Sequence, residues 1–331
     1  MGALLLGGRV RGCLRALPKP PRFAGGDALV RALLVLVLSS TSCAAPPPPP
    51  PDFQKAGEKA LEWVGRLVSL GPRPAGSLAQ KKQQQMIVAE LRSLDLQVVE
   101  DDFIAQTPKG AVPMKNIIAK LPGAGKRVVV VSGHYDTLQR PGLHFVGAND
   151  GGSSAGFLLA LARLLTGRSL AGRSLKDSVW LVFFDGEESF VSWRNNDHTY
   201  GSRRLASKWS ADGTAGRVKA LINVDMIGDS DLHLTREQYS TAWLRELLAK
   251  TAGKLGYSSI FARQTPTYIE DDHIPFLKAG IDAVDLIDFN YGPSNGYWHT
   301  EQDTADKLSA ESLGTMLHLI TETLQELEAV P

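Results

Sequence analysis

The chain has 331 residues, of which 43% are hydrophobic and 21% are charged, and this balance is typical of a globular protein rather than a disordered or membrane-embedded one. Lys and Arg together number 36 against 35 Asp and Glu, so the net charge of +1 gives no electrostatic reason to expect nucleic acid or an anionic membrane surface as a partner. We therefore expect one large domain, acting as a monomer, whose specificity comes from a local site.

The first 45 residues are predicted to be an export leader. Basic residues precede a short apolar run at 32–38, and small residues follow it at 39–45, which is the layout of a signal peptide. The run is shorter than the roughly 20 apolar residues that a membrane-spanning helix needs. The sequence therefore predicts an exported protein rather than a permanently membrane-spanning one.

Two outcomes for the leader stay open, because Cys43 follows a run of small residues. In a lipoprotein this cysteine would carry a lipid that attaches the protein to a membrane, whereas in a secreted protein it would be cut away with the leader. The protein would accordingly be secreted, periplasmic or envelope-anchored. Residues 46–52 form a proline-rich linker, and residues 53–331 form the folded domain.

Helices and strands alternate along the folded domain. Helices are predicted from hydrophobic spacing and from their end signals at Phe53–Leu70, Leu78–Leu94, Ser153–Leu165, Tyr200–Trp209, Thr241–Gly256 and Ser309–Leu327. Strands are predicted at Gln97–Ile104, Asn116–Lys120, Arg127–Ser132, Val179–Phe184, Ala220–Asp225 and Ala283–Ile287. This alternation predicts an α/β fold, a three-layer sandwich in which helices flank both faces of a mostly parallel central sheet.

Polar side chains follow three of the predicted buried strands. His134 and Asp136 come after the first of these strands, Asp185–Glu188 come after the second, and Asp225 ends the third. In open α/β sheets the crevice beyond the carboxyl ends of the strands is the usual ligand site. We therefore expect these groups to gather in one place.

Four residues are candidates for a catalytic metal site. The only cysteines, Cys13 and Cys43, precede the folded domain, so its metal ligands must be His, Asp or Glu. Taken alone, Asp150 could cap a helix, His299 could be an exposed loop histidine, and the Glu187–Glu188 pair could be a solvated acidic loop. Together, one histidine and two carboxylates with a vacant fourth position are the pattern of a catalytic zinc site. Only one glutamate of the pair would bind the metal, and its neighbour would be free to accept and release protons.

Other chemistries lack their signatures in this sequence. The G-x-S-x-G pattern occurs at 152–156 and 292–296, but neither copy joins a predicted strand directly to a predicted helix, as a nucleophile elbow does, and the folded domain has no cysteine for a Cys/His pair. The G-x-G-x-x-G and Walker phosphate loops are also absent. Serine, cysteine, hydride-transfer and phosphoryl-transfer mechanisms are therefore disfavoured.

Five motifs carry a family resemblance. In chain order they are HYDT (134–137), GAND (147–150), DGEE (185–188), NVDMIGD (223–229) and WHTEQDT (298–304). The series resembles the family that contains zinc aminopeptidases and animal-type glutaminyl cyclases, over nearly all of residues 53–327. The resemblance implies a zinc aminopeptidase-like fold, with residues 53–331 as a zinc-dependent catalytic domain.

The family has two branches, and the first is that of the two-zinc aminopeptidases, which release N-terminal amino acids. There the resemblance implies two zinc ions, with Glu187 as the base for a metal-bound water. The implied ligands are His134, Asp150, Glu188, Asp225 and His299. Every one of these positions is suitably occupied in this chain.

The second branch is that of the glutaminyl cyclases, and further stretches are similar to it. These stretches are FFDGEESFVSW (183–193), DHTYGSRRLA (197–206) and EDDHIPFLKAGI (270–281). The resemblance then implies a glutaminyl-peptide cyclotransferase, an acyltransferase that converts the N-terminal glutamine of peptides or proteins to pyroglutamate and releases ammonia. We predict this function, and we keep the aminopeptidase as the alternative.

The cyclase resemblance also implies roles for individual residues. One Zn²⁺ would be held by Asp150, Glu188 and His299. Glu187 would be the acid/base, and Asp225 and Asp271 would complete the catalytic carboxylates, with Asp225 and His134 standing behind the metal site. Trp193 and Trp298 would enclose the glutamine side chain. A third hypothesis, a non-catalytic binding domain on this fold, is disfavoured because such a domain has no need of Glu187.

Overall fold

The computed structural model describes residues 52–167, 175–261 and 266–330, and all of them lie within one compact unit of the chain, 47–331. The predicted leader, Cys13, Cys43 and all but the last residue of the proline-rich linker fall outside the described residues. Among the helices in the described ranges, none is long and apolar enough to cross a membrane.

The helices begin and end close to the predicted boundaries. The α-helices are α1 (Phe53–Val68), α2 (Leu78–Ser93), α3 (Gly152–Thr166), α4 (Tyr200–Asp212), α5 (Ala242–Leu255), α6 (His273–Lys278) and α7 (Ala310–Glu328). Short 3-10 turns occur at Thr214–Arg217, Ser258–Phe261, Pro293–Asn295 and Ala305–Lys307. Side-chain caps fix three of the helix starts, because Asp52, Ser77 and Ser309 each accept a hydrogen bond from the backbone three residues on.

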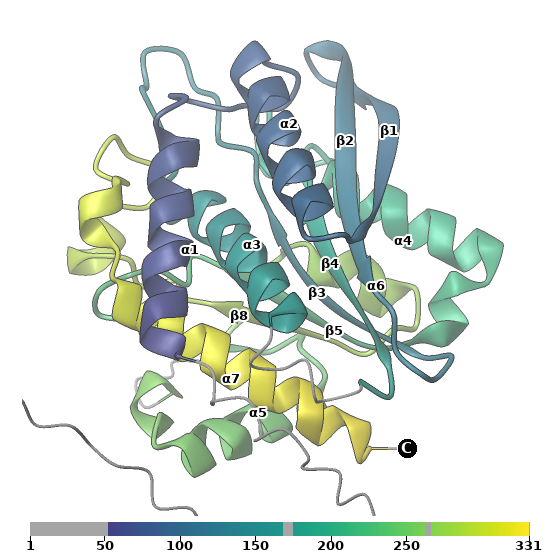
Figure 1. The fold of residues 1–331 in the computed structure, drawn as a ribbon. Coiled ribbons are helices and arrows are strands. Elements are labelled where there is room, and N and C mark those ends of the chain that lie inside the picture. Colours follow the sequence, from purple (N-terminus) through teal and green to yellow (C-terminus); the bar gives the residue numbers. More distant parts are fainter. Residues whose placement is uncertain (1–51, 168–174, 262–265, 331) are drawn as a thin grey trace, which may run out of the picture. The chain divides into compact units, whose positions relative to one another are not determined.

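The central sheet has six strands in the order β1-β2-β4-β3-β5-β8 (Figure 1). The strands are β1 (Gln97–Thr107), β2 (Gly110–Leu121), β3 (Val128–His134), β4 (Ser178–Phe184), β5 (Val218–Asp225) and β8 (Ala283–Ile287). The last four in spatial order pair in parallel, whereas β1 and β2 form an antiparallel hairpin that joins the sheet through β4. A separate pair of two-residue strands, β6 (Arg236–Glu237) and β7 (Pro266–Thr267), lies apart from this sheet.

Helices cover both faces of the sheet, as predicted (Figure 1). The alternating side chains of β3 divide between two cores: Val129 and Val131 pack with α1, α2, α3, α5 and α7, and Val128 and Val130 pack with α4 and α6. Two-sided burial explains why β3 reads as an uninterrupted valine run. The three-layer α/β sandwich is therefore confirmed.

Two local expectations needed correction. The first strand runs past its predicted end, Ile104, to Thr107, and the second begins at Gly110 rather than at Asn116, so that the two pair in a hairpin that Pro108 and Lys109 close. Strand β3 also continues two residues past Ser132, so His134 is its last residue. Surface side chains interrupt the alternation of the hairpin, and for this reason its full length was not visible in the hydrophobic pattern.

Candidate active site

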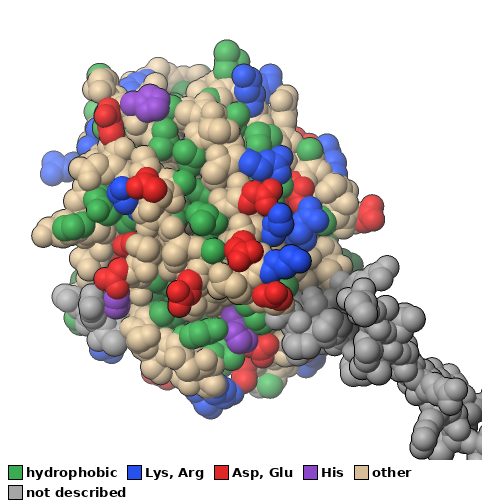
Figure 2. Space-filling model, turned by 60° about the vertical axis from the view of Figure 1, so that its left-hand side comes forward, with side chains coloured by type: hydrophobic (Ala, Val, Ile, Leu, Met, Phe, Trp, Pro, Cys, Tyr) green, Lys and Arg blue, Asp and Glu red, His purple; other side chains and the backbone are tan. Residues whose placement is uncertain are grey.

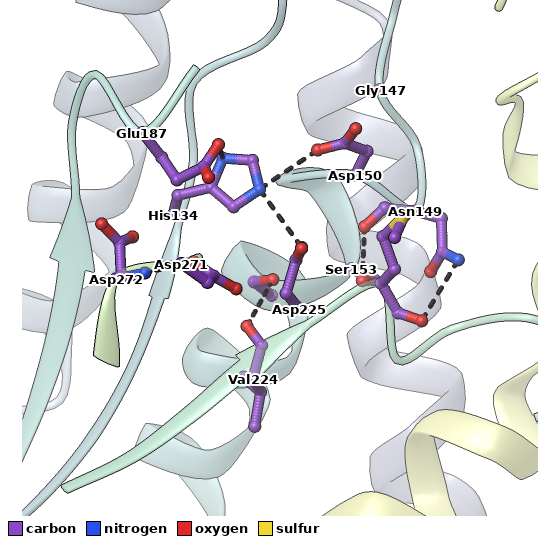
Figure 3. Close-up of polar contacts among 12 residues, drawn as sticks. His134, Gly147, Asn149, Asp150, Ser153, Glu187, Val224, Asp225, Asp271 and Asp272 are labelled. Atoms are coloured by element: carbon purple, nitrogen blue, oxygen red, sulfur yellow. Dashed lines mark hydrogen bonds and ion pairs between the residues drawn. The ribbon is translucent and has the colours of Figure 1, made fainter. Parts of the chain in front are cut away.

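The polar residues predicted to converge do so at the carboxyl ends of three neighbouring parallel strands. His134 ends β3, Asp225 ends β5, and Asp185–Glu188 follow β4 directly. Figure 3 shows His134 pointing between Asp150 and Asp225, with Glu187 on its other side. The parallel sheet thus brings together carboxylates that are far apart in the sequence.

Two groups of candidate metal ligands share the Asp150 carboxylate. In the first group, His299 Nε2 lies 3.3 Å from Asp150 Oδ2 and 3.3 Å from Glu188 Oε1. In the second, His134 Nε2 lies 3.1 Å from Asp150 Oδ1 and 3.2 Å from Asp225 Oδ1. Within each group the ligand atoms all lie within 4.8 Å of one another, a spacing that suits ligands around one ion.

The chemistry of the first group fits a zinc ion. Asp150 Oδ2 and both carboxylate oxygens of Glu188 are buried and have no hydrogen-bond partner in the described parts of the chain. Buried carboxylate oxygens are costly without a donor or a cation. Two buried carboxylates and one largely buried imidazole nitrogen, all lining the same pocket, make a donor set that zinc accepts.

The Asp150 loop is held from two sides. The carboxylate of Asp303 accepts hydrogen bonds from Asn149 N at 2.7 Å and from Asp150 N at 3.1 Å. On the other side, the fully buried guanidinium of Arg73 donates to the carbonyl oxygens of Val146 at 2.8 Å and Gly147 at 3.2 Å. Gly147 has φ +51°, and a Cβ there would lie 2.5 Å from Asp150 O, so glycine is required. The supporting roles of Arg73 and Asp303 were not predicted.

The two adjacent glutamates are held by Asp136. Its Oδ1 accepts a hydrogen bond from Glu187 N at 3.0 Å, and its Oδ2 accepts one from Glu188 N at 3.3 Å. Glu188 then faces His299, whereas Glu187 Oε2 lies 3.9 Å from His134 Nδ1. The backbone therefore presents one carboxylate to the metal site and leaves its neighbour beside it.

The environment of Glu187 favours its neutral form. The side chain is buried, and burial together with repulsion from Glu188 raises its pKa well above the ordinary value, although His134 opposes the change. A bound cation would lower this pKa again. With burial raising its pKa and a cation lowering it, the Glu187 carboxyl group would be suited to accepting and releasing a proton near neutral pH.

A pocket of about 350 Å³ opens onto these residues. Its lining includes the predicted residues Asp150, Glu187, Glu188, Trp193, Asp225, Asp271, Trp298 and His299. The lining also includes six residues to which no role was assigned from the sequence: Thr267, Tyr268, Ile269, Glu270, Ile287 and Phe289. All the predicted substrate and catalytic residues therefore face one cavity, and most of the unassigned ones follow β7 or end β8.

The two tryptophans of the pocket are each stacked on a histidine. Trp298 lies over His299 with ring centroids 4.1 Å apart, and it also contacts Phe289 at 4.8 Å. Trp193 stacks on His198 with centroids 4.3 Å apart. These contacts orient both indoles along the pocket.

The Asp271 carboxylate is held by the side-chain amide of Asn223. Asn223 Nδ2 donates to Asp271 Oδ2 at 3.2 Å and to Asp285 Oδ1 at 3.1 Å, and Asp272 N donates to Asp271 Oδ1. Asp225 instead pairs with His134. Asp271 is thereby fixed on the pocket wall, independently of Asp225.

A model of Peptidase family M28 matches residues 116–324. The chain belongs to peptidase family M28. It is similar to the glutaminyl-peptide cyclotransferase of Drosophila melanogaster, with 34% identity over 271 residues that cover 75% of this chain and 76% of the relative. The crystal structure of Acidobacteriales bacterium glutaminyl cyclase is 37% identical with a TM-score of 0.78, over 86% of this chain and 98% of that one.

A structure with lower sequence identity shares the fold. A Zn-dependent exopeptidase from Parabacteroides distasonis is 24% identical with a TM-score of 0.71, over 83% of this chain and 98% of that one. The family match and the cyclotransferase relatives confirm the resemblance found in the sequence, and they place this chain among the glutaminyl cyclases of family M28.

Proposed function

We propose that this M28 protein converts the N-terminal glutamine of peptides or proteins to pyroglutamate and releases ammonia. The observation that carries the proposal is the pocket, which places two tryptophans and the Asp271 carboxylate next to one metal-ligand group and Glu187. Its volume of about 350 Å³ suits a single amino-acid residue rather than a long peptide. The similarity of the chain to the glutaminyl cyclases named above supports the same activity.

One zinc ion held by Asp150, Glu188 and His299 would polarise the side-chain amide carbonyl of the glutamine and stabilise the negative charge that develops on its oxygen. The unpartnered oxygens of Asp150 and Glu188 support this ligand set. His134 and Asp225 would then stand behind it as supporting groups, since their hydrogen bond already satisfies His134 Nε2.

Glu187 carries the proton in the proposed reaction. The α-amine nitrogen attacks the side-chain amide carbon, a C–N bond closes the ring, and the bond to the amide nitrogen breaks. Glu187 accepts the proton that the amine loses and returns it to the departing nitrogen, which leaves as ammonia. The reaction consumes no water, so the pocket does not need a site for a water molecule and can exclude water from the reacting groups.

The pocket walls supply the proximity that this reaction needs. An N-terminal glutamine must fold back so that its amine approaches its own side-chain carbonyl, and an extended side chain does not cyclise. Flat indole surfaces of Trp193 and Trp298 restrict the side chain to a folded shape, while Asp271 lies within the pocket as an acceptor for the amide or the amine. Because the reacting groups are already held together when the substrate is bound, the ring-closing step does not have to overcome the loss of conformational freedom that would otherwise slow it.

A two-metal aminopeptidase is the second candidate, because the His134, Asp150 and Asp225 group is also suited to a cation. The two functions differ in metal content and in product. A cyclase is expected to hold one zinc per chain and to release ammonia from a Gln-initiated peptide without shortening it. An aminopeptidase is expected to hold two and to release free amino acids, and that result would overturn the proposed cyclase.

The proposals for location rest on the leader alone. We propose export, followed by secretion or by attachment through a lipid on Cys43, with the catalytic domain acting as a monomer on peptide N-termini. Mass spectrometry of the mature N-terminus separates the two routes. A free amine downstream of Cys43 would exclude the lipid, and an acylated cysteine would exclude plain secretion.

A further inference from the structure

The pocket has a closed floor and an open mouth, and Tyr268 marks the mouth. Its side chain is 70% exposed, whereas the pocket residues Asp271 and Ile269 are only 3% and 9% exposed. The metal ligands and Glu187 are at the buried end. A peptide that presents its first residue to this floor would leave the pocket at its exposed end, which Tyr268 and Glu270 line.

A second exposed aromatic ring extends this rim. Tyr239 is 47% exposed and contacts Tyr268 edge to face, with ring centroids 5.1 Å apart and planes at 62°. Within the described ranges the large exposed hydrophobic side chains are Leu78, Ile104, Val191, Tyr239 and Tyr268. Large apolar side chains that meet at the surface, beside a binding pocket, are typical of recognition sites rather than of ordinary surface.

A buried carboxylate fixes both tyrosine segments. Glu237 is 1% exposed, and its Oε1 accepts hydrogen bonds from Tyr239 N at 2.8 Å and from Ile269 N at 3.3 Å. Its Oε2 accepts hydrogen bonds from Ser240 N at 2.6 Å and from the Ser240 hydroxyl at 2.7 Å.

Strand pairing joins the same two segments, since β6 pairs with β7 and Gln238 N donates to Thr267 O at 3.0 Å. A buried charge and a strand pair thus hold two solvent-facing rings in one arrangement. A surface that is ordered before its ligand arrives loses less conformational freedom on binding.

We propose that Tyr268 and Tyr239 form a subsite for the residue that follows the N-terminal glutamine, and that it takes an apolar or aromatic side chain. The inference rests on the proposed function, because that function places the first residue at the pocket floor. The two rings offer an apolar surface at the exposed end of the pocket, where the second residue of such a peptide would emerge. They would select peptides by the second residue without taking part in the chemistry.

Charge makes a different selection possible at the same rim. Glu270 also lines the pocket, its side chain is 54% exposed, and its Oε2 lies 4.0 Å from His198 Nε2. A lysine at the second position would suit this carboxylate and could also lie over a tyrosine ring. The apolar preference and a basic preference therefore have to be compared in one experiment.

The test compares three peptides, Gln-Phe-Ala, Gln-Ser-Ala and Gln-Lys-Ala, by the kcat/KM of ammonia release from the full-length protein. We expect Gln-Phe-Ala to exceed Gln-Ser-Ala roughly five- to tenfold, in line with one aromatic contact. In Y268A and in the Y239A/Y268A double variant this ratio should fall to about one. Y268F, which keeps the ring, and L78A, which removes an exposed apolar side chain outside the pocket, should both keep it.

The outcomes separate the subsite from the function. Equal kcat/KM for the Phe and Ser peptides in the unaltered protein, or a ratio that survives in Y239A/Y268A, would overturn the subsite alone. A preference for Gln-Lys-Ala that disappears in E270Q would replace the apolar occupant with a basic one. Release of free glutamine from all three peptides, without ammonia, would overturn the proposed function instead.

Discussion

His198 stacks on Trp193 with ring centroids 4.3 Å apart and planes within 12° of parallel. Among the residues that the structure describes, this is the only ring contact of the Trp193 indole, which forms one wall of the pocket. His198 is itself held in place: its carbonyl oxygen accepts hydrogen bonds from Arg203, and its Nδ1 lies 3.2 Å from the Thr199 hydroxyl. The imidazole is therefore the support behind the pocket wall.

Removing this support should weaken substrate binding more than turnover. In H198A we expect the KM for a Gln-initiated peptide to rise roughly three- to tenfold, because an aromatic stack of this kind contributes about 0.5–1.5 kcal/mol. The kcat should change much less, since Glu187 and the metal ligands keep their contacts. H198F should restore KM, and steady-state kinetics on the three proteins measure the effect.

The chain offers a matched control for this change. His318, on α7, stacks on Phe53 with centroids 4.1 Å apart and planes at 14°, and neither residue lines the pocket. H318A should therefore leave KM unaltered, although it removes the same kind of stack. A KM in H198A equal to that of the unaltered protein would contradict the role of His198.

Glu187 is predicted to be required for the chemical step and not for the metal site. Replacing it with glutamine keeps its size but removes its ability to accept a proton, so kcat should fall about 10²- to 10⁴-fold. The zinc content, measured by elemental analysis, should stay the same because Glu188 and not Glu187 faces His299. E58Q, at an exposed position on α1, serves as the control, and a fully active E187Q would exclude the proposed proton carrier.

Asp303 is predicted to act on the metal through the Asp150 loop. D303N keeps the shape of the side chain but weakens its acceptance of the Asn149 and Asp150 N–H groups, so the loop should hold Asp150 less firmly. Zinc affinity, measured by competition with a chelator, should fall about 10- to 100-fold. D306N, in the next turn at an exposed position, should bind zinc normally, and unchanged affinity in D303N would show that the loop is fixed without it.

The layers of the fold and most residues of the candidate site could be predicted from the sequence. The valine run at β3 and the helical spacing of apolar residues in α1 and α7 are local patterns that indicate burial. They predicted the layers because β3 is buried on both faces of the sheet and the two helices pack on one of these faces. The order of the motifs then indicated which carboxylates would meet. Helix α6 was missed because six residues that include Pro275 give no periodic pattern.

The supporting contacts of the site had no local signal. Arg73 and Asp303 act on the Asp150 loop from opposite ends of the domain sequence. Arg73 lies outside the five motifs, and Asp303 lies within WHTEQDT, but neither stretch indicates which segment its side chain contacts. Strands β6 and β7 have two residues each, too few for alternation to be recognised, so the tyrosines that they position could not be placed at the pocket. Contacts between segments that are distant in the sequence needed the three-dimensional arrangement.

Glu237 should make the stability of the protein depend on pH in the acid range. Burial alone would raise its pKa, but the His273 imidazole, whose Nε2 lies 3.3 Å from Glu237 Oε2, and hydrogen bonds from Tyr239 N and Ser240 lower it to about 2. A carboxylate whose pKa is lowered by folding stabilises the folded state above its unfolded pKa of about 4.5, and this contribution is lost as the pH falls towards 2. The free energy of unfolding of E237Q should therefore lie below that of the unaltered protein at pH 6, and the difference should shrink between pH 4.5 and 3. Denaturant unfolding at each pH measures it, E270Q at the exposed rim is the control, and a difference that stays constant with pH would mean that the Glu237 charge is not what stabilises these segments.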